Sequence, residues 1–194
     1  MADLAVEMLQ LSLQAFKEGV KDLPKRIGVL DNQLDDLETA VKHYLIQLDN
    51  ASLTKEQSQR ELALLHISTE LEAIGDIVDR QLMRLARHKR RKQIAFSQEE
   101  WEDIVAYHGE VLSLLQRAAS GLAAQDPTIA DEVLSQRQWL NQVKREISLR
   151  HLQQLSSGSP TSLNASAIYL EMVSAMSRIL SHTCSISRAV QGDL

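Results

Sequence analysis

The sequence predicts an all-α protein, and three observations support this fold class. Only 7 Gly, 3 Pro and 4% aromatic residues among 194 leave few signals for turns or strands. Leu, Ala, Gln, Glu and Arg, which form helices readily, dominate the composition. The prolines and cap-like polar residues divide the chain into about six segments whose apolar residues recur at helical spacing.

Three helices are expected in the first half of the chain. The first covers about residues 4–19 and the second about 22–48, where Pro24 fits only in the first turn. Residues at core spacing in the second helix are Ile27, Leu30, Leu34, Leu37, Val41, Tyr44 and Leu48. Thr54 and Gln57 form a capping-box pattern that starts a third helix, which runs to about residue 92.

Three more helices are expected in the second half. Ser97 is a candidate N-cap, and the acidic residues Glu99 and Glu100 after it complement the helix dipole. That fourth helix runs to about residue 124. A fifth begins near Pro127 and reaches about residue 155, and a sixth covers about 162–190 after a short loop at 156–160. Three helices followed by three more indicate a duplication.

A shift of about 105 residues aligns the two copies. It lays Ile67–Val78 over Met172–Thr183, a faint similarity. Three acids of the first half then fall on uncharged residues: Glu72, Asp76 and Asp79 on Ser177, Ser181 and Cys184. If the repeat is real, the second copy lacks the acids of the first.

The acids of the first copy are a candidate metal site. Glu72, Asp76 and Asp79 lie within about 60° of one another on a helix, a repulsive arrangement unless a cation or basic partner offsets it. A second acidic stripe lies on the preceding helix: Asp31, Asp35 and Glu38. If a bundle brings the stripes together, their oxygens suit a hard divalent cation. The alternative is two solvated helix faces.

A basic segment follows the acids. Between residues 81 and 92 there are six basic residues and no acid: Arg84, Arg87, Lys89, Arg90, Arg91 and Lys92. In one interpretation these cations end the helix favourably and keep it soluble. In the other they contact anionic lipid headgroups or an acidic partner, with each basic residue near such a membrane adding about 1 kcal/mol.

Several functions are excluded or disfavoured by the sequence. A net charge of −5 argues against nucleic-acid binding, and a single cysteine, Cys184, excludes an intrachain disulfide and is expected in the core. No segment resembles a signal peptide or a membrane span. His66 and His182 are expected to be hydrogen-bonded and at least half-buried, and no catalytic or phosphate-cradling motif occurs, so we predict no enzyme.

Several motifs resemble the PhoU family. Residues 64–76 (LLHISTELEAIGD) are similar to its leucine-rich helix with Glu-x-x-x-Asp, although Ala73 replaces the usual arginine. Four later segments resemble the cytoplasmic PhoU-like region that follows the membrane domain of bacterial sodium/phosphate cotransporter-type proteins: residues 130–132, 150–152, 166–171 and 178–182.

This resemblance implies a fold and a role. The fold is six antiparallel helices in two tandem three-helix bundles, residues 1–93 and 94–194. The role is non-enzymatic regulation of phosphate transport, by docking to a membrane phosphate transporter in cis or in trans, in the cytoplasm and at the inner face of the membrane; a homodimer is compatible with it.

The resemblance also bears on metal binding. In stand-alone PhoU proteins the Glu-x-x-x-Asp motif of each repeat is associated with bound metal. Here Glu72 and Asp76 retain the first motif, whereas the second reads Ser177 and Ser181, which favours the transporter-associated branch. No cofactor is required. The alternative function is a divalent-metal-binding bundle with a single carboxylate cluster, holding Mg²⁺, Mn²⁺, iron or Zn²⁺ at Glu72 and Asp76.

Overall fold

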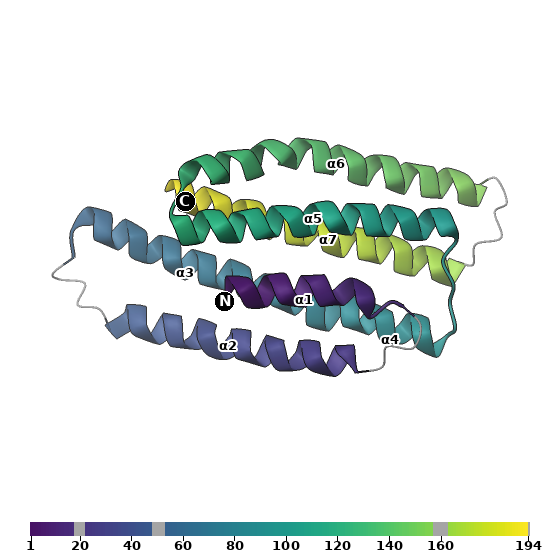
Figure 1. Cartoon of the computed structure of the whole chain (residues 1–194), viewed down its shortest axis with the longest axis horizontal. Helices are drawn as coiled ribbons and strands as arrows, with labels where there is room; N and C mark the ends of the chain where they lie inside the picture. Colours follow the sequence, from purple (N-terminus) through teal and green to yellow (C-terminus); the bar gives the residue numbers. More distant parts are fainter. Residues whose placement is uncertain (18–21, 48–52, 157–162, 194) are drawn as a thin grey trace.

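The predicted all-α fold is confirmed by a computed structural model that describes residues 1–17, 22–47, 53–156 and 163–193. Its helices are α1 (Ala2–Gln14), α2 (Leu23–Gln47), α3 (Lys55–Asp76), α4 (Met83–Arg91), α5 (Gln98–Ala124), α6 (Pro127–Ser156) and α7 (Leu163–Gln191). A π-helical segment, η1 (Ile77–Leu82), joins α3 to α4, so these two form one rod, and the described residues form six rods in which neighbours along the chain are antiparallel (Figure 1). No helix in the described ranges is long and apolar enough to cross a membrane.

Both predicted N-caps are present. Thr54 Oγ1 accepts a hydrogen bond from the backbone N–H of Gln57, and Gln57 Oε1 accepts one from the backbone N–H of Thr54. Ser97 and Glu100 form the same reciprocal pair at the start of α5. These local hydrogen bonds satisfy N–H groups that would otherwise lack partners, which is why both helices begin where predicted.

The first half departs from the sequence prediction in two places. The helix predicted over residues 54–92 contains the π segment η1, which the apolar periodicity did not indicate. Helix α1 ends at Gln14, earlier than predicted, although residues 18–21 lie outside the described part of the chain.

Two residues predicted for the core of α2 are exposed. Leu37 and Tyr44 are 42% and 65% exposed, whereas Ile27 and Leu34 are fully buried. An ion pair between Arg26 and Glu7 shows that α1 runs beside the beginning of α2. Helix α1 has 13 residues and α2 has 25, so α1 is too short to pack along the whole of α2. Leu37 and Tyr44, which the spacing predicted to be buried, lie beyond the part of α2 that α1 contacts.

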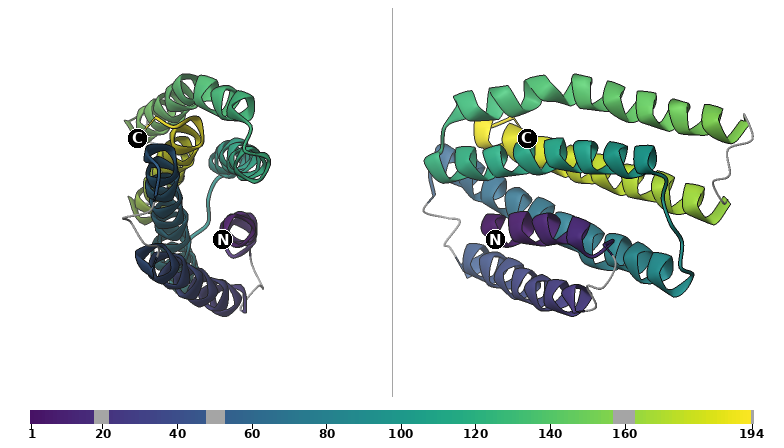
Figure 2. Two further views of the ribbon diagram at one scale, coloured as in Figure 1. Left: turned by 90° about the vertical axis from the view of Figure 1, so that its left-hand side faces the viewer. Right: turned by 45° about the vertical axis from the view of Figure 1, so that its right-hand side comes forward.

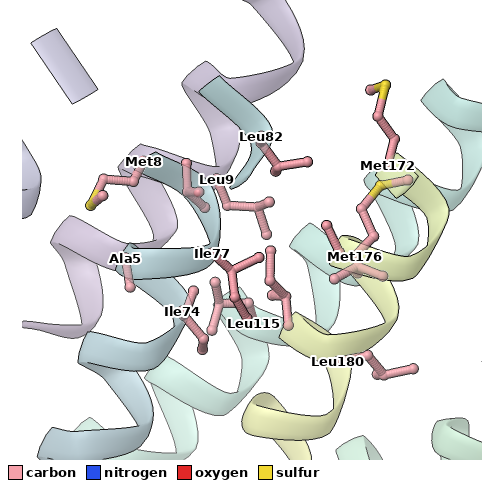
Figure 3. Close-up of a cluster of buried hydrophobic side chains, with 14 of the residues drawn as sticks. Ala5, Met8, Leu9, Ile74, Ile77, Leu82, Leu115, Met172, Met176 and Leu180 are labelled. Atoms are coloured by element: carbon pink, nitrogen blue, oxygen red, sulfur yellow. The ribbon is translucent and has the colours of Figure 1, made fainter. Parts of the chain in front are cut away.

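The two halves share one core. Helices α3 and α7 lie side by side, as do α1 and α5, with α2 and α6 on the outside (Figures 1 and 2). Buried side chains from α1, η1, α5 and α7 meet between the halves, among them Leu9, Ile77, Leu115 and Met176 (Figure 3). The division into residues 1–93 and 94–194 falls between α4 and α5, and its status as two folding units stays a prediction because the core is continuous.

The predicted duplication is visible in the burial pattern. Under the 105-residue shift, seven buried positions of α3 and η1 fall on buried positions of α7: Ile67 on Met172, Ser68 on Val173, Leu71 on Met176, Ile74 on Ile179, Gly75 on Leu180, Val78 on Thr183 and Leu82 on Ser187. The third rods of the two halves therefore present the same face to the core.

Candidate functional site

The seam between α2 and α3 is closed by a glycine. A Cβ atom at Gly75 would lie 2.6 Å from Cδ2 of Leu34 and 3.1 Å from Oδ1 of Asp31. Only a residue without a side chain allows this approach. One turn further along, a Cβ at Gly28 would lie 3.6 Å from Oδ1 of Asp79. The acids of the two helices are thereby brought to one surface, which we call the acidic face: Asp31, Asp35, Glu38, Glu72, Asp76 and Asp79.

Asp31 is the most buried acid of this face. It is only 7% exposed, and no hydrogen bond or ion pair of its side chain is found among the described residues. Its pKa is raised to about 6, chiefly by burial and then by the negative charges of Asp35, Asp79 and Asp76, against the opposing charge of Arg80. A carboxylate in this position has lost much of its water and gained like-charged neighbours.

The other acids are coupled to the same network. Burial is the main cause that raises the pKa of Glu72, followed by the charges of Asp76, Glu38 and Asp35. The pKa of Asp76 is also raised, chiefly by burial. The structure therefore brings together all six acids that the sequence singled out, from two helices.

Two cations balance part of this charge. Arg80 Nε lies 2.8 Å from Oδ1 of Asp76, and Lys42 Nζ lies 2.5 Å from Oε1 of Glu38. Thr69 also donates a hydrogen bond to Glu38, at 3.3 Å. Each ion pair spans one turn of its own helix, with a cation exposed enough for water to screen the pair, whereas the Thr69–Glu38 hydrogen bond joins α3 to α2.

The chemistry of the acidic face fits a hard cation, but its present side-chain arrangement does not enclose one. Carboxylate oxygens are the ligands that Mg²⁺ and Mn²⁺ prefer. Within the described ranges, however, no three His, Cys, Asp or Glu side chains converge to hold a metal ion. A bound cation would have to gather Glu72 and Asp76 and compete with Arg80.

The basic segment lies at the opposite end of the α3–α4 rod from the start of α3 (Figure 1). Among the residues that the structure describes, three of its six residues have partners. Arg84 forms an ion pair of 3.0 Å with Glu171, and Lys89 donates to the carbonyl of Phe16 and lies 5.3 Å above the ring of Phe96. The third is Arg91, which lies 3.4 Å from Nδ1 of His88 one turn earlier. Four of the six are exposed at the end of the rod: Arg87, Arg90, Arg91 and Lys92.

His66, His182 and Cys184 have the surroundings expected of them. His182 Nδ1 lies 2.7 Å from Oε2 of Glu70, and His66 Nε2 lies 2.8 Å from Oγ of Ser185, so both link α3 to α7. Both histidines are half-buried, and Cys184 is fully buried. Burial raises the pKa of the Cys184 thiol, which makes it a poor nucleophile.

A buried polar cluster at one end of the second half was not predicted. His151 Nε2 lies 2.9 Å from Oγ of Ser166, and its Nδ1 lies 3.3 Å from Oε1 of Glu100. The imidazole also stacks on Tyr169 with 4.4 Å between ring centroids, and burial lowers its pKa. The residues come from α5, α6 and α7, so sequence spacing carried no signal that they meet.

This cluster resembles a Ser-His-acid relay in its order only. Ser166, His151 and Glu100 are 5%, 2% and 2% exposed, so a substrate has no access to the hydroxyl. Glu100 is already held by the backbone of Ser97 as part of the capping box. The arrangement ties three helix ends together.

The chain is similar in sequence to a known protein family and to named bacterial proteins. A family model described as the PhoU domain matches residues 1–84 and 104–190. YjbB of Salmonella typhimurium, provisionally named for inorganic phosphate export, is 27% identical over 199 residues, which cover 98% of this chain and 37% of that protein. YjbB of Escherichia coli K12 is 26% identical and is covered to 34%. The chain thus spans about a third of the length of these relatives.

A solved structure has the same fold. The crystal structure of PhoU from Pseudomonas aeruginosa superposes with a TM-score of 0.88 at 17% identity, covering 98% of this chain and 90% of that one. At 17% identity this similarity establishes the arrangement of the helices but not the function of any site.

Proposed function

This chain belongs to the PhoU domain family, and we propose that it is a regulatory domain of phosphate transport, without enzymatic activity, that docks onto a membrane transporter. The relatives named for phosphate export support the connection to phosphate. Because the chain corresponds to about a third of those relatives, the transporter is proposed as a partner either within the same polypeptide or as a separate protein. The proposed setting is the cytoplasmic face of the membrane.

The exposed end of the basic segment carries the docking proposal. Arg87, Arg90, Arg91 and Lys92 project from one end of the α3–α4 rod, and the segment from 81 to 92 contains no acid. Each such residue contributes about 1 kcal/mol near an anionic membrane surface, so four of them favour one end of the molecule for contact with a transporter and its lipids. The rest of the chain is acidic overall, so an anionic membrane surface would attract the basic end and repel the remainder of the molecule.

Charge reversal tests the docking proposal. We would replace Arg87, Arg90 and Arg91 by Glu in the natural full-length protein and measure radiolabelled phosphate flux in cells, together with sedimentation of this chain with transporter-containing membrane vesicles. Reversal should reduce sedimentation and alter flux.

A matched triple reversal provides the control for that experiment. Lys55, Arg60 and Arg145 are exposed and lie outside the basic segment. Their replacement by Glu changes the net charge by the same amount and should leave both measurements at the wild-type level. Equal behaviour of the two triple variants would refute docking through the basic end.

Divalent-cation binding at the acidic face is a second candidate function. The deeply buried carboxyl of Asp31, among like charges, supports it, because a bound cation would relieve both the burial penalty and the repulsion. Glu72 and Asp76 would be ligands, and the ion would supply charge neutralisation between α2 and α3.

Calorimetry with Mg²⁺, Mn²⁺, Fe²⁺ and Zn²⁺ tests the second candidate. Wild type should release a saturable binding heat that the Glu72→Ala/Asp76→Ala variant lacks. Glu56→Ala/Glu102→Ala is the matched control, since both side chains are exposed and lie outside the acidic face. Equal, negligible heats for all three proteins would eliminate this function.

A further inference from the structure

The seam between α6 and α7 contains a pocket that is distinct from the acidic face and from the basic segment. We call it the arginine pocket. It is open to solvent, has a volume of about 570 Å³ and is lined by Leu134, Ser135, Arg137, Gln138, Asn141 and Arg188. Five of these residues come from α6 and one from α7.

Hydrogen-bond donors dominate the lining. Arg137 and Arg188 are half-buried, and no hydrogen bond or ion pair of either guanidinium is found among the described residues. The amides of Gln138 and Asn141 add further donors. Ser135 is engaged elsewhere, since its hydroxyl donates to the carbonyl of Glu132.

No carboxylate lines the pocket. Asp131, which lies on the same seam, instead accepts a hydrogen bond from Gln191. Two guanidinium groups from different helices thus face one pocket without a counter-charge in its lining, in a chain whose net charge is −5. Guanidinium forks match the oxygens of phosphate and related anions in geometry and charge.

The pocket occupies the place in the second half that corresponds to the acidic face in the first. Cys184, the counterpart of Asp79, is close enough to Arg137 and Arg188 that their charges oppose the rise that burial causes in its thiol pKa. Lys144 of α6 donates at 3.0 Å to Ser177, the counterpart of Glu72. One seam therefore presents acids to solvent, and its counterpart presents cations.

We propose that the arginine pocket binds free inorganic phosphate or a similar small tetrahedral oxyanion, held by Arg137 and Arg188 with Gln138 and Asn141 as further donors. This goes beyond docking, because it gives the domain a soluble ligand of its own. Arg188 lies in the last turn of α7, at the opposite end of the long axis from α4 (Figure 1). A membrane in contact with the basic segment would therefore leave this pocket open to solvent, which favours a free anion over a lipid headgroup.

Titration of the whole chain with inorganic phosphate in a phosphate-free buffer tests the proposal. Calorimetry should show one saturable site in wild type, and the affinity should fall by about tenfold or more in Arg137→Gln and in Arg188→Gln. Arg145→Gln is the matched control, because Arg145 is an exposed arginine of α6 outside the pocket. It should bind phosphate as wild type does.

A thermal-shift measurement separates loss of the site from loss of the fold. Phosphate should raise the Tm of wild type and of Arg145→Gln, and leave the Tm of the folded Arg137→Gln/Arg188→Gln variant unchanged. The proposal is overturned if wild type shows no saturable binding at millimolar phosphate, or if the double variant binds equally well. It is also overturned if only phosphatidate vesicles bind through these arginines. None of these measurements involves a transporter, so their outcome is independent of docking.

Discussion

The two seams formed by the second and third helices of each half have the same place in the fold and opposite charge. The α2–α3 seam carries five acids toward solvent and the buried Asp31, whereas the α6–α7 seam carries Arg137, Lys144 and Arg188. Seven buried positions of α3 and η1 nevertheless fall on buried positions of α7. Packing constrains the inner face of each third helix, while the rim of the seam is free to change its charge and therefore its ligand.

The helix itself also differs between the seams. In the first half Asp79 and Arg80 lie within the π segment η1, whereas the corresponding part of α7 is a regular α-helix. A π segment inserts an extra residue into the turn and shifts the side chains around it, and such segments occur often at functional sites. Asp79 is thus presented by a locally altered backbone, and its counterpart Cys184 is not.

The largest effect should come from filling the close approach at Gly75. Gly75→Val would push a branched side chain against Leu34 and Asp31, and we expect a loss of about 3 kcal/mol of unfolding free energy. In Gly109→Val the new Cβ meets nothing within 4 Å, so the change should stay within about 0.5 kcal/mol. Urea unfolding measures both. Equal stabilities would mean that the α2–α3 seam is looser than the structure indicates.

The next largest effect concerns the buried acid of that seam. The pKa of Asp31 is raised from 3.8 to about 6, so the folded state binds a proton more tightly than the unfolded state. Its contribution to stability is therefore present at low pH and declines as the pH rises from about 4 to about 6. Asp31→Asn should stabilise the protein by about 2 kcal/mol at pH 7 and have little effect near pH 4.

Unfolding free energies at several pH values check the Asp31 prediction. The difference between wild type and Asp31→Asn should grow across that pH interval and then level off. A difference that is independent of pH would show that the pKa of Asp31 is not raised in the folded protein.

A smaller effect is expected in the other seam. Lys144→Ala removes the donor to Ser177 and should cost about 1 kcal/mol, because a part-buried hydrogen bond to a charged group is lost. Exposed Lys55→Ala is the control and should be close to neutral. If both changes are neutral in thermal unfolding, the hydrogen bond from Lys144 to Ser177 does not stabilise the α6–α7 seam.

The smallest effect should come from Arg80. Its side chain is 67% exposed, so the ion pair with Asp76 is screened, and Arg80→Gln should cost only about 0.5 kcal/mol at low salt and less at high salt. If the acidic face binds a divalent cation, the same variant should bind it more tightly, because a competing positive charge is gone. Weaker cation binding in Arg80→Gln would contradict the competition described above.

The sequence predicted which residues form the acidic face, but only part of how they are arranged. The i,i+4 and i,i+3 spacing of Glu72, Asp76 and Asp79 placed them on one stripe, and helical geometry alone secures that. Their meeting with Asp31 depends on the close approach of α2 and α3 at Gly75, which spacing does not reveal. The proposed ligand of this face stays a prediction.

The arginine pocket and the Glu100–His151–Ser166 cluster were beyond sequence reasoning. Arg137 and Arg188 are 51 positions apart, and their shared pocket exists only because α6 and α7 pack antiparallel in one register. Leu37 and Tyr44 are the opposite case, in which the sequence predicted a tertiary contact that the fold does not form. Their spacing predicted burial, but the short α1 leaves them exposed, since burial depends on what another helix covers.

By itself, the sequence determined the helical class, six rods, the N-caps at Thr54 and Ser97, the acidic stripes and the membership of the PhoU family. These follow from interactions within about four residues and from motifs that are read directly in the chain. The tertiary structure decided which stripes face each other, where the π segment lies and which cations gather at the α6–α7 seam. Those features depend on helix register and on burial, which arise only when segments distant in sequence pack together.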